Sequence, residues 1–206
     1  MWAQRLALFL RVCGAVSAVG AGLAFAQPFP APAGIADCTE ALNISVQVYG
    51  KLPPAQVVSY MEHAHQLCRE QRGPDHPDTL RTMSNLALSY SALGRGAEAL
   101  MLSEETLALR RTKLGPDHPG TLSSMNNLAN SYSALGRTAE ALKLGEETLA
   151  LRRTKLGPDH PDTLASMGEL ANSYSALGRS AEALKLGEET LALMRTKLGQ
   201  IGRAHV

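Results

Sequence analysis

The sequence predicts an all-α solenoid of stacked antiparallel helix pairs. Three observations support it: an internal repeat, helical spacing of apolar residues within the repeat, and abundant alanine and leucine. The pentapeptide GPDHP begins at Gly73, Gly115 and Gly157, which are evenly spaced along the chain. Residues 73–114 and 115–156 agree at 34 of 42 positions, and residues 115–156 and 157–198 agree at 36 of 42. Such a fixed period indicates a unit that buries its apolar face by stacking on its neighbours.

Apolar residues within each repeat have the spacing of two helices. Proline is well tolerated as a first helical residue, which places Asp75 or His76 near the N-cap. One face of the first helix is then apolar, and Gly94 ends it as a left-handed cap. The second helix has apolar residues on two sides, because it packs on its partner and on the next repeat. The apolar positions are Leu80, Met83, Leu86, Ala87, Tyr90 and Leu93 in the first helix, and Ala97, Leu100, Leu102, Leu107, Leu109 and Leu114 in the second.

Composition and charge argue against several classes of protein. The chain has 206 residues, with 20 Lys+Arg against 19 Asp+Glu, and only 4% of its residues are aromatic. No basic stripe is present, and aromatic side chains on which bases could stack are scarce, so nucleic-acid binding is not expected. Alanine and leucine are strong helix formers and suit closely packed helices.

The N-terminal segment 1–26 has the pattern of a secretory signal peptide. Arg5 and Arg11 precede an apolar run, and Ala24-Phe25-Ala26 fits the small-x-small pattern of a cleavage site. The uncharged run is shorter than the roughly 20 residues of a membrane span, so an uncleaved anchor is the less favoured alternative. We therefore expect an exported chain, periplasmic or secreted, with a Pro-rich spacer at 27–36 and no membrane segment after cleavage.

Residues 37–72 predict a degenerate capping repeat, with helices at 37–50 and 55–72 and a turn between them. Terminal repeats are commonly atypical, because one of their faces meets water. In an antiparallel hairpin that turns near Leu52, Cys38 and Cys68 lie opposite each other. We predict a Cys38–Cys68 disulfide, since such bonds persist in exported proteins. The alternative is two free cysteines.

The repeats resemble the tetratricopeptide repeat, in the long form found in kinesin light chains. The pattern is Asn127-Leu128-Ala129-x-x-Tyr132, then Gly136-Arg137, Ala139-Glu140-Ala141 and the Leu-Gly-Pro-Asp-His-Pro link. The resemblance covers residues 73–198 and implies a right-handed superhelix whose first helices line a concave groove. The chain departs from the family at Gly145 and Gly187, where a large residue is usual. We expect looser packing there, either from neutral drift or from a pocket or close helix crossing.

The resemblance also implies that polar residues of the groove bind an extended peptide. In related repeats, groove asparagines hydrogen-bond a peptide backbone, and an amide both donates and accepts. The candidate contacts lie opposite the apolar stripe of the first helices: Asn127, Asn130, Asn172, Asn85, Arg81, Ser133 and Ser175. The alternative is that these residues simply solvate an exposed helix face.

No catalytic, metal-binding or cofactor-binding residues are predicted. His76, His118 and His160 recur once per repeat, and helix spacings of 8–10 Å place them too far apart to share one ion. We therefore expect a non-catalytic interaction scaffold that binds a protein or peptide. One alternative is the recognition arm of a larger enzyme or signalling protein whose catalytic domain is missing from this chain. Another is a purely structural spacer.

The pattern changes at Gly199, where Pro-Asp-His-Pro does not follow. Residues 201–206 read IGRAHV, which is also the translation of a common sequencing adapter. We expect residues 199–206 to be a truncated or artefactual tail.

Overall fold

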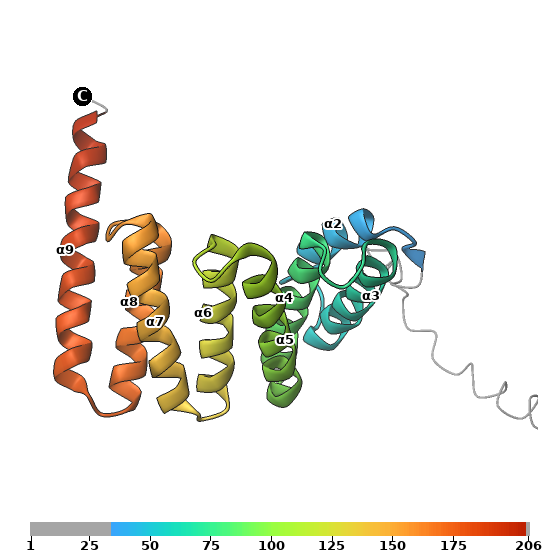
Figure 1. Ribbon diagram of the computed structural model, residues 1–206, viewed down its shortest axis with the longest axis horizontal. Helices are drawn as coiled ribbons and strands as arrows, with labels where there is room; N and C mark the ends of the chain where they lie inside the picture. The colour runs from blue at the N-terminus through green and yellow to red at the C-terminus, as the bar shows by residue number, and fades with distance from the viewer. Residues whose placement is uncertain (1–33, 205–206) are drawn as a thin grey trace, which may run out of the picture. The chain divides into compact units, whose positions relative to one another are not determined.

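The computed structural model describes residues 34–204, and side chains as far as residue 197; the predicted signal peptide lies outside the described residues. All regular elements in the described range are helical, which confirms the all-α prediction. Each helix packs against the next one along the chain (Figure 1). They are α2 (Cys38–Val48), α3 (Pro54–Arg72), α4 (Pro77–Ala92), α5 (Gly96–Leu114), α6 (Pro119–Ala134), α7 (Thr138–Leu156), α8 (Pro161–Ala176) and α9 (Ser180–Ala204).

Histidine caps begin the first helix of each repeat. The Nδ1 atom of His76 accepts a hydrogen bond from the backbone N–H of Asp78 at 3.2 Å, and Pro77 occupies the first turn. His118 and His160 make the same bond to the second residue beyond them. These bonds satisfy one of the free N–H groups at each helix start. The recurring histidines are therefore structural caps, as their spacing predicted.

Glycine residues end the first helices of the repeats, and proline residues begin them. Gly94, Gly136 and Gly178 have φ between 72° and 78°, the left-handed region that a C-terminal cap uses. The helix α9 differs from its counterparts α5 and α7, because it continues beyond Gly199 to Ala204. The sequence explains this difference, since no proline follows Gly199 to interrupt the backbone hydrogen bonds.

The core consists of side chains from successive helices at each junction between repeats. Met125 and Leu122 of α6 are fully buried and pack with Leu107 of α5 and Leu128. The predicted apolar stripe is confirmed at Leu80, Met83, Leu86 and Ala87, which are buried. It is wrong at its margins, where Leu93, Ala97 and Leu114 are exposed near helix ends. Threonines that the prediction passed over fill part of the core, including Thr79, Thr106, Thr121, Thr148 and Thr163.

A tyrosine, two glutamates and an arginine connect consecutive repeats. The Tyr132 hydroxyl donates to Glu104 of the preceding repeat at 3.1 Å, while the Arg137 guanidinium lies 4.4 Å from the centre of the Tyr132 ring. Arg137 also pairs with Glu140 at 2.8 Å. The same arrangement recurs around Tyr90 and Tyr174. Glutamates of the second helices, such as Glu104 and Glu147, therefore bridge consecutive repeats.

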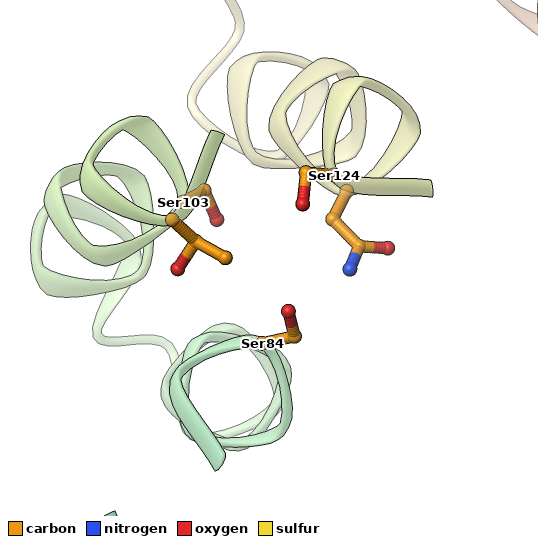
Figure 2. Close-up of a pocket in the computed structure, with 5 residues that line it drawn as sticks. Ser84, Ser103 and Ser124 are labelled. Atoms are coloured by element: carbon orange, nitrogen blue, oxygen red, sulfur yellow. The ribbon is translucent and has the colours of Figure 1, made fainter. Parts of the chain in front are cut away.

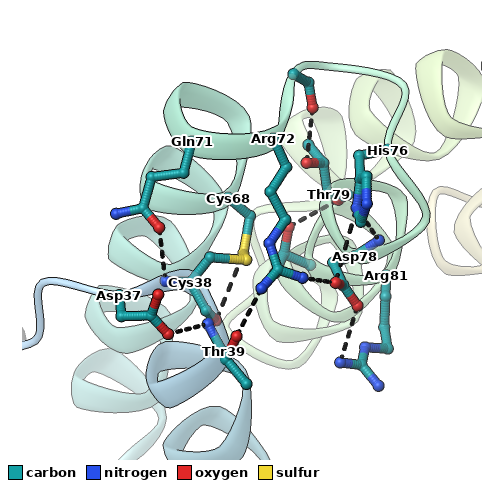
Figure 3. Close-up of polar contacts among 12 residues, drawn as sticks. Asp37, Cys38, Thr39, Cys68, Gln71, Arg72, His76, Asp78, Thr79 and Arg81 are labelled. Atoms are coloured by element: carbon teal, nitrogen blue, oxygen red, sulfur yellow. Dashed lines mark hydrogen bonds and ion pairs between the residues drawn. A yellow bond between two sulfur atoms is a disulfide. The ribbon is translucent and has the colours of Figure 1, made fainter.

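The pair α2 and α3 is held by a disulfide and a set of polar bonds. Cys38 and Cys68 are joined and fully buried, as predicted. Beside the bridge, Arg72 binds Thr39 of α2 and Asp78 of α4, while Gln71 accepts from the Cys38 backbone N–H (Figure 3). Arg72 therefore ties this helix pair to the first regular repeat. Export stays a prediction.

Removal of the disulfide is expected to destabilise the protein. The bridge closes a loop with a sequence separation of 30. In the chain-entropy model, the double variant Cys38→Ala/Cys68→Ala loses roughly 3–4 kcal/mol of unfolding free energy. Urea unfolding followed by circular dichroism measures this, with the reduced wild-type protein as a second reference. An unchanged midpoint in both would contradict a stabilising bridge.

The junction at Tyr90 predicts a loss of stability in alkali. Burial, and then the hydrogen bond and charge of Glu62, raise the pKa of Tyr90 from 10.0 to about 12. Because the pKa is higher in the folded state, the neutral phenol contributes fully below pH 10. That contribution disappears as the pH rises towards about 12. Tyr90→Phe should therefore flatten the fall of the thermal midpoint between pH 10 and pH 12.

Thermal unfolding across that range, with Tyr49→Phe as a control, tests the prediction. An identical alkaline slope for wild type and Tyr90→Phe would show that this phenol is not linked to folding.

Candidate functional site

A polar cavity lies between the first helices of the second and third regular repeats. Its volume is about 280 Å³. Three of the predicted groove residues line it: Asn130 and Ser133 from α6, and Asn172 from α8. These side chains are exposed, so a ligand could reach their amide and hydroxyl groups. The remaining lining residues are Thr138 from α7 and Glu169, Ser173 and Ala176 from α8.

A smaller cavity of about 20 Å³ adjoins this one between α6, α7 and α8. It shares Asn130, Ser133, Glu169 and Ser173 with the larger cavity, and Gly145 of α7 forms part of its wall. A Cβ atom at Gly145 would lie 3.2 Å from Leu170 Cδ1, which is a tight contact. At Gly145 the predicted looser packing is therefore wrong, and the alternative of a close helix approach holds, because the glycine lets α8 come near. At Gly187 a Cβ atom would meet nothing within 4 Å, which agrees with the looser packing predicted there. We call the two adjoining cavities, with their lining residues, the α6–α8 groove.

Glu169 is the groove residue that the sequence prediction missed. It lines both cavities, and its Oε2 atom is buried without a hydrogen-bond partner. The sequence contained a sign of it. The equivalent residues of the three repeats are Asn85, Asn127 and Glu169, so only the third repeat carries a charge at this position.

Arg152 supports the wall of the groove from behind. It is only 6% exposed, and its Nη1 donates to the Asp162 carbonyl oxygen at 2.8 Å and to the Ser166 hydroxyl at 2.6 Å. Burial lowers the pKa of Arg152, while the carboxylates of Asp162 and Glu169 oppose that effect. Arg152 thus fixes the start of α8 and lies in the electrostatic field of Glu169.

The other predicted contact residues lie elsewhere. Asn127 faces a separate small void between α4, α5 and α6, where Figure 2 shows Ser84, Ser103 and Ser124 around a common space. Arg81 pairs with Asp78 at 3.2 Å. The backbone carbonyl of Asn85 accepts from the Tyr49 hydroxyl, and that of Ser175 accepts from the Gly178 N–H at the helix end. The structure therefore brings together three of the seven predicted groove residues.

Another cavity, with a volume of about 530 Å³, lies near the GPDHP links between α4, α5 and α6. Of its two long cationic side chains, Lys113 pairs with Asp75, and Arg110 donates to the carbonyl oxygens of Gly120 and Leu80 and to the Ser124 hydroxyl. Because these cations already connect the helices around them, the α6–α8 groove is the better candidate for a binding site.

Metal-binding clusters and membrane-spanning helices are both absent from residues 34–204. No group of three or more histidine, cysteine or acidic side chains is arranged to hold a metal ion. In the same range, no helix is both long enough and apolar enough to cross a membrane.

Stacked helix pairs, capped alike in every repeat, define a helical repeat scaffold, and comparison with known proteins identifies its family. The tetratricopeptide repeat family model matches residues 55–112, 82–154 and 146–196. The chain therefore belongs to the tetratricopeptide repeat family, whose scaffolds typically mediate protein–protein interactions and are generally non-catalytic. No curated protein sequence gives a significant match.

Solved structures with the same fold include a putative kinesin light chain with nearly identical TPR-like repeats from Podosopora anserina. It is 29% identical, with a TM-score of 0.66, over 78% of this chain and 76% of that one. BtubC (BKLC) from P. vanneervenii is 17% identical, with a TM-score of 0.70, over 84% of this chain and 68% of that one. MamA is 13% identical, with a TM-score of 0.57, over 80% and 82% of the two chains.

Replacement of Arg152 tests its role behind the groove. Methionine is the natural choice, because Met194 holds the equivalent position in the next repeat. Arg152→Met leaves the Asp162 carbonyl and Ser166 hydroxyl without their donor, and should lower the unfolding free energy by about 1–3 kcal/mol. Arg153→Met is the matched control, since it removes only a partly exposed pair with Glu189, worth about 0–1 kcal/mol. Equal losses in urea unfolding would contradict a special role for Arg152.

Proposed function

We propose that the chain is a non-catalytic scaffold that binds an extended segment of a partner protein in the α6–α8 groove. The observation that carries the proposal is the cavity of about 280 Å³, which Asn130 and Asn172 line from adjacent repeats. They hold the same position in their repeats. A ligand that runs along the groove can therefore meet the same amide group twice.

The chemistry of this wall suits a peptide backbone. Each asparagine offers an N–H₂ donor and a carbonyl acceptor, which complement the C=O and N–H groups of an extended strand. The hydroxyls of Ser133 and Ser173 add groups that can donate or accept. Rigid helices position all of these side chains, so little ordering of the scaffold is needed when a segment binds.

Family membership supports the same proposal at a coarser level, because tetratricopeptide repeats are typical of protein–protein interaction. The similar solved structures support the fold of the scaffold.

The double variant Asn130→Ala/Asn172→Ala should weaken peptide binding roughly tenfold or more. Each lost hydrogen bond contributes about 0.5–1.5 kcal/mol, and about 1.4 kcal/mol corresponds to a factor of ten in affinity. The probe is a pooled library of acetylated and amidated nonapeptides with a fluorescent label, and the readout is fluorescence anisotropy. Blocked termini remove end-group charges from the comparison.

Asn43→Ala is the matched control, because Asn43 is an exposed asparagine on α2, far along the chain from the groove. It should leave binding unchanged. If the wild type binds no member of the pool, or if the double variant binds as well as the wild type, the groove is not the peptide site.

A further inference from the structure

The α6–α8 groove contains a carboxylate oxygen whose hydrogen bonding is incomplete. Glu169 lines both of its cavities, yet its Oε2 atom is buried and has no hydrogen-bond partner. A buried acceptor without a donor is costly, and more so when it is charged. This oxygen is therefore a place where a ligand's donor would gain more than at an exposed carboxylate.

The rest of the groove does not supply that donor as a cation. The residues that line the two cavities include no lysine, arginine or histidine. Arg152, behind the wall, does not supply it either: its Nη1 donates to the Asp162 carbonyl and the Ser166 hydroxyl, and its buried Nε makes no hydrogen bond to Glu169 or to any other group. Glu169 is the one charged residue lining these cavities, so the groove offers a negative charge to whatever enters it.

The repeat itself shows that the charge is specific to this groove. In the preceding repeat the equivalent residue is Asn127, which faces a void lined by Ser84, Ser103, Thr106 and Ser124 that has essentially no room for a water molecule. The equivalent space beside Glu169 is the smaller cavity of about 20 Å³, which shares lining residues with the open cavity of about 280 Å³. The third repeat thus combines an acidic side chain with space for a side chain of the ligand.

From this combination we propose that the groove selects a segment with a cationic side chain, lysine or arginine, whose N–H group donates to the carboxylate of Glu169. This inference rests on the proposed peptide-binding function and adds the charge of the partner. Asn130 and Asn172 would hydrogen-bond the peptide backbone on either side, while Glu169 would bind the cationic side chain between them. Charge-assisted hydrogen bonds of this kind are shorter and stronger than neutral ones.

Three peptide pools test the proposal. Each contains acetylated and amidated nonapeptides that are random except at the centre, which is fixed as lysine, glutamine or glutamate. We expect the wild-type protein to bind the lysine pool about tenfold more tightly than the glutamine pool, and the glutamate pool most weakly. Fluorescence anisotropy at low and physiological salt gives the ratios.

Matched variants locate the source of the preference. Glu169→Asn introduces the residue that the preceding repeat already carries and should abolish the lysine preference while binding of the glutamine pool persists. Glu188→Asn removes an equal charge from an exposed position on α9 and should keep the preference. Asn127→Glu adds a charge at the equivalent position of the preceding repeat, where the void has no room for a ligand. It should not increase the preference for lysine. Circular dichroism and thermal midpoints establish that each variant is folded.

The outcomes separate this inference from the function on which it rests. If no pool binds the wild type, the groove function fails and this inference fails with it. If the pools bind equally, or if Glu169→Asn keeps the lysine preference, the groove binds peptides but Glu169 does not select their charge. If Glu188→Asn abolishes the preference as well, the effect arises from the overall charge of the protein, and the proposal is wrong.

Discussion

The stacking of one helix pair on the next is the constraint on which the rest of the structure depends. A single pair cannot bury apolar residues such as Met125 and Leu107 by itself, because they belong to one cluster that spans two repeats. The core consequently forms at the junctions: residues of α5 and α6 make one cluster, and residues of α7, α8 and α9 make the next. Polar groups at each junction then fix the register. Tyr132, Glu104 and Arg137 do so at one end of the first helix. Half-buried Arg110 and buried Arg152 do so at the other end.

The same constraint explains why the groove can vary. Residues that cover a junction must repeat, since each one meets the same partner in the next copy of the unit. Residues on the groove side of the first helices are less constrained by packing, and there the copies differ: Asn127 becomes Glu169, and Asn126 becomes Gly168. The fold therefore depends on the positions that keep the repeat, whereas the proposed selection of charge depends on Glu169, a position that breaks it.

Much of the fold follows from local chemistry that a sequence displays directly. The histidine caps, the glycine at the end of each first helix and the proline at the start of the next fix helix bounds without reference to the rest of the chain. The Cys38–Cys68 bridge follows from hairpin geometry. The partners of Glu104 and Glu147 could not be predicted in this way, because their bonds join residues 28 and 36 positions apart across a junction. Asn127 and Asn130 are both asparagines on α6, yet the first lies beside a small void and the second beside an open cavity. This difference arises from the packing of three helices, which the sequence does not display.

Every regular junction uses the same atoms at the same sequence separation, which has a consequence for how such a chain changes over generations. Tyr132 and Tyr174 each bind a glutamate 28 residues earlier, and Arg111 and Arg153 each bind one 36 residues later. Recombination that inserts or removes one whole repeat therefore leaves all of these bonds with an identical partner. An insertion of another length inside a helix moves these partners out of register, so a change by whole repeats is the one that keeps every junction intact.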